Sequence, residues 1–414
     1  MKTVRKKKSR GDQQRERREA LINAGLRIVN KHGYVNASVS RVTEAAGLAQ
    51  GTLYSYFDSH QAYLEELLNV EGARFFLQIN KHTEISENFF DTERSAFLAF
   101  SRYIKRHPYF LRVLTDAESA APTSYAQHMD RVEARYLKAL QYAAGEGQIR
   151  LRDREAFRDI GEVLGGAYGH LGLGAQGRPF AGDATSGLFP DWVADTYIGF
   201  IKRGFEESID VRIPTSVPEP VQSAGSTREA LLEAAARVVW NVGFAGATIK
   251  AIVEEADLAV GTFYSHFESQ QEIFDELLNH VRAKMLDHVR KFVTGNTRFI
   301  DREYAGFVGF FDYLRHQPWY IRIESAAAVY ATETYRRHFF DLADNYVRTM
   351  RHAQAKGELA RFDDRELPVL AYVMMAARHY FAARHLPPTA SNRSLPAHVY
   401  ESYRSFLEKG LEAR

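Results

Sequence analysis

The chain has 414 residues, of which 45% are hydrophobic, and a formal net charge of +2. This length is too great for one ordinary hydrophobic core and predicts two domains of about 200 residues each. The absence of cysteine excludes a disulfide framework, a thiolate zinc site and a cysteine nucleophile.

The N-terminal residues 1–16 are strongly basic and have no apolar periodicity. They predict a flexible basic arm, in which Lys6, Lys7 and Lys8 are candidate contacts to nucleic-acid phosphates. A simple solvated tail is the alternative. No signal-peptide-like apolar segment follows the arm, and no run of about 18 apolar residues occurs, so we expect a cytoplasmic protein.

Residues 17–62 predict a helix-turn-helix domain built from three short helical segments. The first covers about 14–32 and the second about 38–45. A tight turn at Gly47 leads to the third, "QGTLYSYF" (50–57). Two short helices joined by such a turn place the second of them in the major groove of DNA.

The third segment has an inner and an outer face. Leu53 and Phe57 are four residues apart and predict the face that packs on the domain core. Small and hydroxyl-bearing residues fall on the other face, where glycine allows close approach to DNA and threonine or tyrosine can contact phosphates and bases. The candidate DNA contacts of this domain are Ser38, Arg41, Gln50, Gly51, Thr52, Tyr54, Ser55, Tyr56 and His60.

The remainder of the first half, residues 63–209, predicts helices throughout. A glycine-rich stretch at 172–187 predicts a loop that is longer than its counterpart in the second half. Residues 210–226 then include three prolines and few large apolar residues, which is typical of an extended linker.

The second half of the chain repeats the first. Residues 228–278 match residues 18–68 at 23 of 51 positions without a gap, and the spacing of 210 residues persists far downstream. The repeat predicts a second helix-turn-helix domain at 227–272 and a second helical body at 273–414. The corresponding candidate DNA contacts are Thr248, Lys250, Val260, Gly261, Thr262, Tyr264, Ser265 and His266.

The two helix-turn-helix regions differ in charge. Residues 1–60 contain 12 Lys/Arg and 5 Asp/Glu, whereas residues 211–270 contain 4 Lys/Arg and 7 Asp/Glu. Gln50 can read adenine in the major groove, but Val260 can make only apolar contacts. We therefore expect the first copy to supply most of the DNA affinity, on an operator whose two half-sites differ. A second copy that makes no base contacts and acts as a structural partner is the alternative.

The segments "ASVSRVTEAAGLAQGTLYSYFDSHQAYLEELL" (37–68) and "ATIKAIVEEADLAVGTFYSHFESQQEIFDELL" (247–278) resemble the DNA-binding domain of TetR-type transcriptional regulators. The resemblance implies an all-α chain of two tandem TetR-like units, each with a helical ligand-binding and dimerisation body. It also implies a DNA-binding repressor associated with the nucleoid. The sequence departs from the family pattern at His60 and Gln270, where a phosphate-binding lysine is common, and at Asp257, which replaces the turn glycine.

A duplicated chain can supply both halves of a dimer. We predict that helices near 156–172 and 188–207 pair with helices near 366–384 and 396–412, so that one chain forms its own pseudo-dimer. A homodimer of tandem chains, with four DNA-binding domains, is the alternative. A helical scaffold or interaction protein with a degenerate second DNA-binding domain is the alternative for the function.

Both helical bodies are rich in aromatic residues, most of which we expect in the core. Where some of them line a cavity, its ligand would be a small and largely apolar effector. The chain has no glycine-rich loop after a strand, no metal-binding histidine pair and no nucleophile elbow, so we expect no enzyme activity, cofactor or metal. The candidate cavity residues are Phe100, Tyr103, Phe110, His128, Phe310, Tyr313, Trp319, His338 and His379, and the alternative for each histidine is an ordinary structural role.

Overall fold

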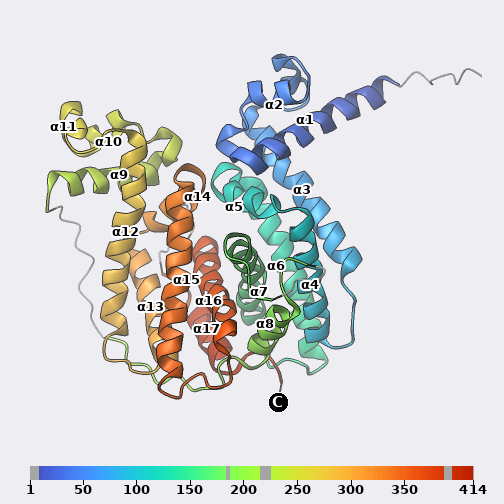
Figure 1. The fold of residues 1–414 in the computed structure, drawn as a ribbon, viewed down its shortest axis with the longest axis vertical. Helices are drawn as coiled ribbons and strands as arrows, with labels where there is room; N and C mark the ends of the chain where they lie inside the picture. Colours follow the sequence, from blue (N-terminus) through green and yellow to red (C-terminus); the bar gives the residue numbers. More distant parts are fainter. Residues whose placement is uncertain (1–8, 183–186, 215–224, 387–393, 414) are drawn as a thin grey trace, which may run out of the picture. The chain divides into compact units, whose positions relative to one another are not determined.

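A computed structural model of the protein describes residues 9–182, 187–214, 225–386 and 394–413. These residues form helices joined by turns, and their one bridge between extended residues pairs Ile149 with Glu412 (Figure 1). The expected all-α fold is therefore confirmed for these residues.

The helices divide into two compact units. Unit 1 comprises residues 1–77 and 107–129, and unit 2 comprises residues 78–106 and 130–414. Unit 1 holds the first helix-turn-helix domain, and its elements are α1 (Arg10–His32), η1 (Tyr34–Asn36), α2 (Val39–Ala45), η2 (Gln50–Ser55), the start of α3 (His60–His82), α5 (Phe110–Ala120) and the start of α6 (Pro122–Gly145).

Unit 2 contains the remaining helices of both copies. Its first-copy helices are the ends of α3 and α6 together with α4 (Phe89–Arg106), α7 (Arg154–Gly177) and α8 (Asp191–Arg203). Its second-copy helices are α9 (Thr227–Gly246), α10 (Ile249–Glu255), α11 (Val260–Tyr264), α12 (Gln270–Val293), α13 (Phe299–His316), α14 (Trp319–Tyr330), α15 (Thr332–Gln354), η3 (Asp364–Glu366), α16 (Leu367–His385) and α17 (Ala397–Lys409).

Unit 1 has an apolar core that joins its helix-turn-helix to α3. Leu21, Val42, Leu53 and Tyr63 are fully buried there. The hydroxyl of Tyr63 donates a hydrogen bond of 2.9 Å to the carbonyl of Leu21. The same hydroxyl lies 1.9 Å from where a Cβ at Gly25 would be, so this crossing of α1 and α3 requires glycine.

Helix α1 begins earlier than the sequence predicted, which corrects the C-terminal boundary of the basic arm at residue 16. Ser9 accepts a hydrogen bond from the amide of Asp12, whose carboxylate accepts one from the amide of Ser9, so the two residues form a capping box. This cap starts the helix at Arg10. Residues 1–8, including Lys6, Lys7 and Lys8, lie outside the described residues.

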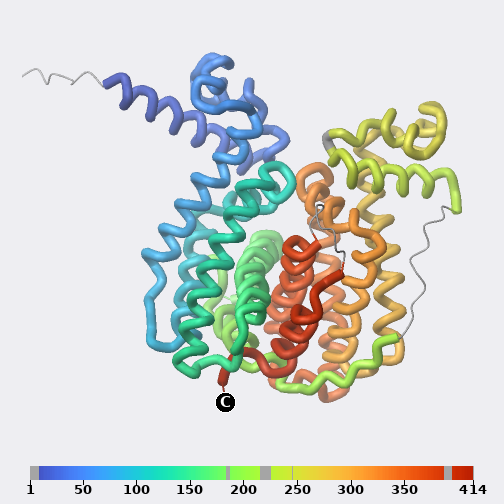
Figure 2. The backbone as a smooth tube through the Cα atoms, turned by 180° about the vertical axis from the view of Figure 1, so that it is seen from behind, coloured from blue at the N-terminus to red at the C-terminus, as the bar shows by residue number. Residues whose placement is uncertain are grey.

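Helix α7 is also longer than predicted, because the stretch expected to begin a loop at residue 172 continues as helix to Gly177. Its glycines face aromatic side chains of the second copy: a Cβ at Gly174 would lie 2.4 Å from the Tyr372 ring, and a Cβ at Gly177 would lie 2.0 Å from the Phe340 ring. The packing of α7 against α16 thus outweighs the low helix propensity of glycine. Figures 1 and 2 show these two helices side by side.

The contacts between the two copies within unit 2 are reciprocal. Arg150 of the first copy donates through Nε to the carbonyl of Gly410, at the end of α17. Arg361 of the second copy donates to the carbonyl of Gly204, at the end of α8. Gly204 and Gly410 have positive φ angles of 60° and 63°, and each leaves no room for a Cβ beside the other copy's backbone. Such exchange of equivalent contacts is the mark of a two-fold interface.

Side-chain sizes across this interface are complementary rather than equal. A Cβ at Gly166 in α7 would lie 2.3 Å from Cδ2 of Tyr380 in α16, and one at Gly169 would lie 3.2 Å from its hydroxyl. The small residues are therefore on the first copy and the large residues on the second. Ala376 stands where the first copy has Gly166, so two second copies paired in this way would place Tyr380 against a larger residue.

Charges at the interface are divided in the same way. Arg384 of the second copy forms ion pairs with Glu133 at 2.7 Å and with Glu162 at 3.5 Å, both on the first copy. His398 of the second copy lies 2.9 Å from Asp159 of the first. Burial raises the pKa of Glu162 to about 8, and Arg384 opposes that rise. The acidic members of this cluster belong to the first copy, whereas Arg384 and His398 come from the second and Arg158, which pairs with Glu133 at 2.9 Å, comes from the first.

The predicted linker begins against the second copy. The amide of Asp210 donates to the carboxylate of Asp301 at 2.7 Å, and the amide of Arg212 donates to the side chain of Asn296 at 2.8 Å. Residues 215–224 of the linker lie outside the described residues. Within the described ranges, no helix has the length and apolar character needed to cross a membrane.

Candidate functional site

We call residues 50–57 and their equivalents 260–267 the recognition segments. The recognition segment of the first copy has the inner and outer faces that its sequence predicts. Leu53 is fully buried and Phe57 is 7% exposed, while the side chain of Tyr54 points to solvent with 55% of its surface exposed. No atom lies within 4 Å of the position that a Cβ at Gly51 would take. The segment is a short 3-10 helix, η2, and Gly47 in the preceding turn has a φ of 66°.

The second copy builds the same geometry from different residues. Phe263 and Phe267 are buried at 0% and 1% exposure, and Tyr264 is 58% exposed. Asp257 takes the left-handed conformation of the missing turn glycine, with a φ of 55°. Asp tolerates this conformation better than most residues, so the turn survives its replacement.

The surroundings of the second recognition segment are more acidic. Lys250 forms a helical ion pair with Glu254 at 3.7 Å, and Arg237 pairs with Glu255 at 2.6 Å. The first copy has alanine, Ala45, at the position equivalent to Glu255. Two of the second domain's cations are thus held by carboxylates, and the first residue of its recognition helix, Val260, is apolar and 47% exposed.

Some predicted DNA contacts already have partners within unit 1. Nε2 of His60 lies 2.7 Å from the carbonyl of Ala37, so the ring ties the start of α3 to the residue before α2. Gln270 makes the equivalent bond, 2.8 Å long, to Ala247. Arg41 donates to the side chain of Asn36 at 2.7 Å and remains exposed.

The remaining predicted contacts are distributed over the exposed and partly exposed surface of the two domains. Thr248 caps α10 by accepting from the amide of Ala251 at 3.2 Å, whereas the Ser38 hydroxyl at the N-cap of α2 forms no capping bond and lies 3.3 Å from the hydroxyl of Ser40. Tyr56 and His266 are partly buried. Five residues are exposed or partly exposed on each recognition segment. In the first copy they are Gln50, Gly51, Thr52, Tyr54 and Ser55, and in the second copy they are Val260, Gly261, Thr262, Tyr264 and Ser265.

Both helix-turn-helix domains match one family of known proteins. The family of bacterial regulatory proteins called tetR matches residues 21–67 and again residues 231–277. The chain belongs to the TetR family. Its two TetR-type domains lie in tandem, and the spacing between the matches equals the spacing of the sequence repeat.

Curated relatives of this TetR-type chain include the HTH-type transcriptional repressor KstR. The Mycobacterium tuberculosis protein is 30% identical over 120 residues, which are 29% of this chain and 54% of that protein. The Rhodococcus jostii protein is 31% identical over 121 residues, 29% of this chain and 55% of that protein. The chain thus matches about half the length of these relatives.

Solved structures of TetR-type proteins also resemble parts of the chain. A TetR family transcription regulator from Marinobacter aquaeolei covers 42% of this chain and 91% of its own, at 21% identity and a TM-score of 0.36. A putative fatty acid metabolism regulator from Clostridium perfringens covers 44% of this chain and 95% of its own, at 15% identity and a TM-score of 0.36.

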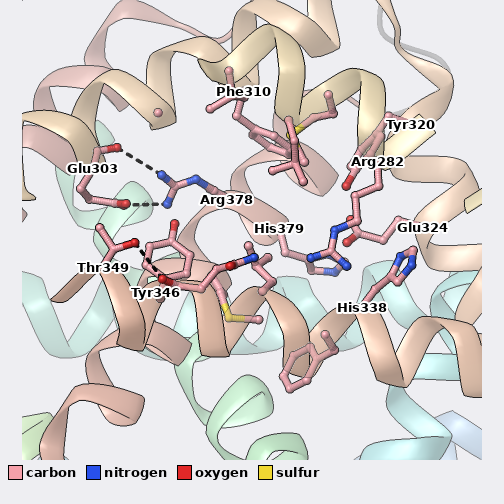
Figure 3. A pocket seen from close by; sticks show the side chains of 18 of the residues that line it. Arg282, Glu303, Phe310, Tyr320, Glu324, His338, Tyr346, Thr349, Arg378 and His379 are labelled. Atoms are coloured by element: carbon pink, nitrogen blue, oxygen red, sulfur yellow. Dashed lines mark hydrogen bonds and ion pairs between the residues drawn. The ribbon is translucent and has the colours of Figure 1, made fainter. Parts of the chain in front are cut away.

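A cavity of about 260 Å³ lies within unit 2, in the helical body of the second TetR-type copy (Figure 3). Apolar side chains supply most of its wall, and one first-copy residue, His170 of α7, joins them. His170 is 8% exposed, and burial lowers its pKa to about 3, so it is a neutral imidazole. The apolar lining includes Leu278, Met285, Val289, Phe310, Leu342 and Met375.

Three of the predicted cavity residues, Phe310, His338 and His379, line this cavity. Tyr313 is buried, and neither it nor Trp319 is among the residues of its wall. The four first-copy candidates are also buried but elsewhere, Phe100 and Tyr103 in unit 2 and Phe110 and His128 in unit 1. Their role in ligand binding stays a prediction.

Part of the cavity wall is the buried ion pair of Glu303 with Arg378, in which the two charges neutralise each other. Arg378 donates to Glu303 at 2.7 Å, and Tyr403 donates to the same carboxylate at 2.6 Å. In the first copy the equivalent carboxylate, Glu93, accepts instead from three tyrosine hydroxyls at 2.9–3.1 Å. Burial raises the pKa of Glu93, and these hydroxyls oppose the rise. Arg378 stands where the first copy has Tyr168.

Unit 1 fills the space around α3 with aromatic rings where the second copy has charged and flexible side chains. Gly72, Phe75 and Phe76 stand at the positions of Arg282, Met285 and Leu286. Phe75 stacks on Phe110 with ring centres 4.6 Å apart, and Phe76 lies 5.0 Å from the ring of His128.

The sequence prediction did not include the charged residues of the cavity, Arg282, Arg302, Glu303, Glu324 and Arg378. One signal was available, because Arg282 interrupts the apolar positions 278, 285 and 289 on one face of α12. A charged residue inside such a stripe indicates either an ion pair or a ligand contact.

Proposed function

We propose that the protein is a DNA-binding transcriptional repressor that acts as a single-chain pseudo-dimer on an operator with two different half-sites, and that a small, largely apolar effector releases it. The observation that carries the proposal is the pair of recognition segments with the same buried and exposed faces in one chain. Each presents an open glycine and an exposed tyrosine, the features suited to close contact with a DNA backbone.

The intramolecular pseudo-dimer is supported by the contacts between the copies. Gly204 and Gly410 occupy equivalent positions, and each packs against the backbone of the other copy, as expected at a two-fold interface. The glycines of α7 against the tyrosines of α16 favour pairing of unlike copies. A homodimer of tandem chains would need a further interface beyond this one.

An asymmetric operator is supported by the differences between the recognition segments. The first segment begins with Gln50, which can form paired hydrogen bonds with adenine, and the second begins with Val260. The ion pairs of Lys250 and Arg237 reduce the positive charge available to phosphates in the second domain. The first copy would therefore bind its half-site more tightly.

Release by an effector is supported by the place of the cavity beside the contact between the copies. Phe339 lines the cavity and lies between the rings of His170, at 5.6 Å, and Tyr372, at 5.5 Å. Tyr372 in turn packs on Gly174 of the first copy. A ligand that displaces Phe339 would thus disturb α7 directly, and a shift of helices at such an interface is a known route to altered binding at a distance.

The test is selection of bound duplexes from a random DNA pool with the full chain, followed by gel shifts of the selected duplex. We expect an imperfect palindrome, bound at least about tenfold more weakly at 200 mM than at 50 mM salt because bound phosphates release counterions. A protein that selects no sequence and shows no salt-sensitive binding would instead be a helical scaffold.

A further inference from the structure

We propose that the cavity of the second copy binds a small apolar monocarboxylate, one molecule per chain, whose carboxylate pairs with Arg282. This inference rests on the proposed function only in that it names the chemical class of the effector. The argument comes from the distribution of charge inside the cavity, from the size of the cavity and from the difference between the copies.

The two ends of the cavity differ in how their charges are satisfied. Figure 3 shows Glu303, Arg378 and Tyr346 together on one side of the cavity and Arg282 with His338 on the other. On the first side the carboxylate and the guanidinium neutralise each other at 2.7 Å. This buried pair therefore has no net charge to attract an ion.

Arg282 is held less tightly. The Arg282 side chain is 13% exposed, and its ion pair to Asp341 spans 4.0 Å, the outer limit of such contacts, while the Asp341 side chain is 53% exposed. A single ion pair of this length leaves most of the five guanidinium donors able to bind a ligand. The planar fork of an arginine fits the two oxygens of a carboxylate.

The neighbouring histidine, His338, adds no charge of its own to this end of the cavity. Nε2 of His338 donates a hydrogen bond of 2.6 Å to the side-chain oxygen of Asn279. Burial and, to a smaller extent, the charge of Arg282 lower the pKa of His338 to about 4. The ring is therefore neutral at physiological pH, and the positive charge of this end comes from Arg282.

Glu324 also lines this end and limits the charge of the ligand. Its carboxylate acts on the same tyrosine as Arg282, since it raises the pKa of Tyr320 while Arg282 lowers it. A ligand anion would compete with Glu324 for the guanidinium. This competition favours a singly charged carboxylate over a more highly charged head such as a phosphate monoester.

The size and lining of the cavity define the rest of the ligand. A volume of about 260 Å³ corresponds to roughly nine water-sized groups at ~30 Å³ each. Leu278, Met285, Val289 and Met375 surround this space and would contact an aliphatic or aromatic body. An eight-carbon chain with one carboxylate has about this size.

The site is expected once per chain because the first copy lacks its charged group. Gly72 occupies the position of Arg282, and a Cβ there would lie 2.8 Å from Nδ1 of His128. Phe75 and Phe76 replace the flexible Met285 and Leu286. The first copy thus has neither the arginine nor room to gain one.

The test is isothermal titration calorimetry of the full chain with octanoate, 1-octanol and octylamine. We expect octanoate to bind at one molecule per chain, and 1-octanol and octylamine to bind about 10- to 100-fold more weakly, as expected for loss of a hydrogen bond to a charged group. Arg282→Met should weaken octanoate to the level of 1-octanol and leave 1-octanol unchanged, which also shows that the variant is folded.

Two further variants make the result specific. Glu324→Gln should bind octanoate more tightly, because it removes the competing carboxylate. Arg290→Met is the control, since Arg290 lies on the same helix, is 72% exposed and is not part of the cavity wall. It should leave octanoate binding unchanged.

Three results would overturn the proposal: no binding of octanoate, equal binding of octanoate and 1-octanol, or unchanged octanoate binding in Arg282→Met. None of these measurements involves DNA. A chain that binds its selected duplex but not octanoate would refute this inference and leave the repressor intact. A chain that binds octanoate but no DNA would support this inference and refute the proposed repressor function.

Discussion

Replacement of Tyr54 by alanine is expected to weaken binding to the selected operator by about 10- to 100-fold, the loss of one or two direct contacts of ~1–3 kcal/mol. The equivalent change Tyr264→Ala is expected to weaken it by less than about threefold. The two side chains are almost equally exposed, at 55% and 58%, so exposure does not distinguish them. The difference comes from their neighbours, which are basic and polar around the first tyrosine and acidic and apolar around the second.

The measurement is a gel shift with the selected duplex at a fixed salt concentration, because affinity for DNA has meaning only at a stated salt. Tyr142→Ala is the matched control, since Tyr142 is 60% exposed on α6 and lies outside both recognition segments. Its binding should equal that of the unchanged protein. Equal losses from Tyr54→Ala and Tyr264→Ala would contradict the asymmetric operator.

Replacement of Gly166 by alanine should destabilise the chain by about 1–3 kcal/mol, because overpacking of a filled interface forces side chains off their rotamers. The added Cβ would lie 2.3 Å from Cδ2 of Tyr380 and 3.0 Å from its Cγ, so the ring cannot simply swing away at its far end. Thermal unfolding followed by circular dichroism measures the change, at roughly 2–4 °C per kcal/mol for a domain of ~200 residues.

The matched control is Gly145→Ala, because no atom lies within 4 Å of a Cβ at that position. A double-mutant cycle with Tyr380→Ala then tests the contact itself. We expect Gly166→Ala to cost little or nothing in the Tyr380→Ala background, where the ring is gone. Additive losses would mean that α7 and α16 do not meet in solution as the structure has them.

The recognition segments were largely predictable from sequence, because their packing is local. Leu53 and Phe57 lie one helical turn apart, and that spacing alone fixes which face is buried. The repeat at a spacing of 210 residues supplied an independent second example. Asp257, which replaces the turn glycine in the repeat, likewise takes the left-handed conformation that this local position requires.

Other features depend on contacts between distant parts of the chain and could not be predicted in this way. The last glycines of α7, from residue 172 onward, suggested a loop, because their helix propensity is low and the rings of Tyr372 and Phe340 that pack on Gly174 and Gly177 belong to the second copy. The cavity residues were predicted from aromatic content, yet its distinctive members are Arg282 and the ion pair of Glu303 with Arg378. Ion pairing across helices leaves no periodic signal in a sequence.

The central claim, that one chain pairs its own two copies, is tested most directly by the mass of the protein in solution. Light scattering at micromolar concentration should give a mass near 47.1 kDa, that of one chain. The selected operator should then bind one such chain. A mass near twice this value, for the free protein or for the protein on the operator, would contradict the pseudo-dimer and indicate a homodimer of tandem chains.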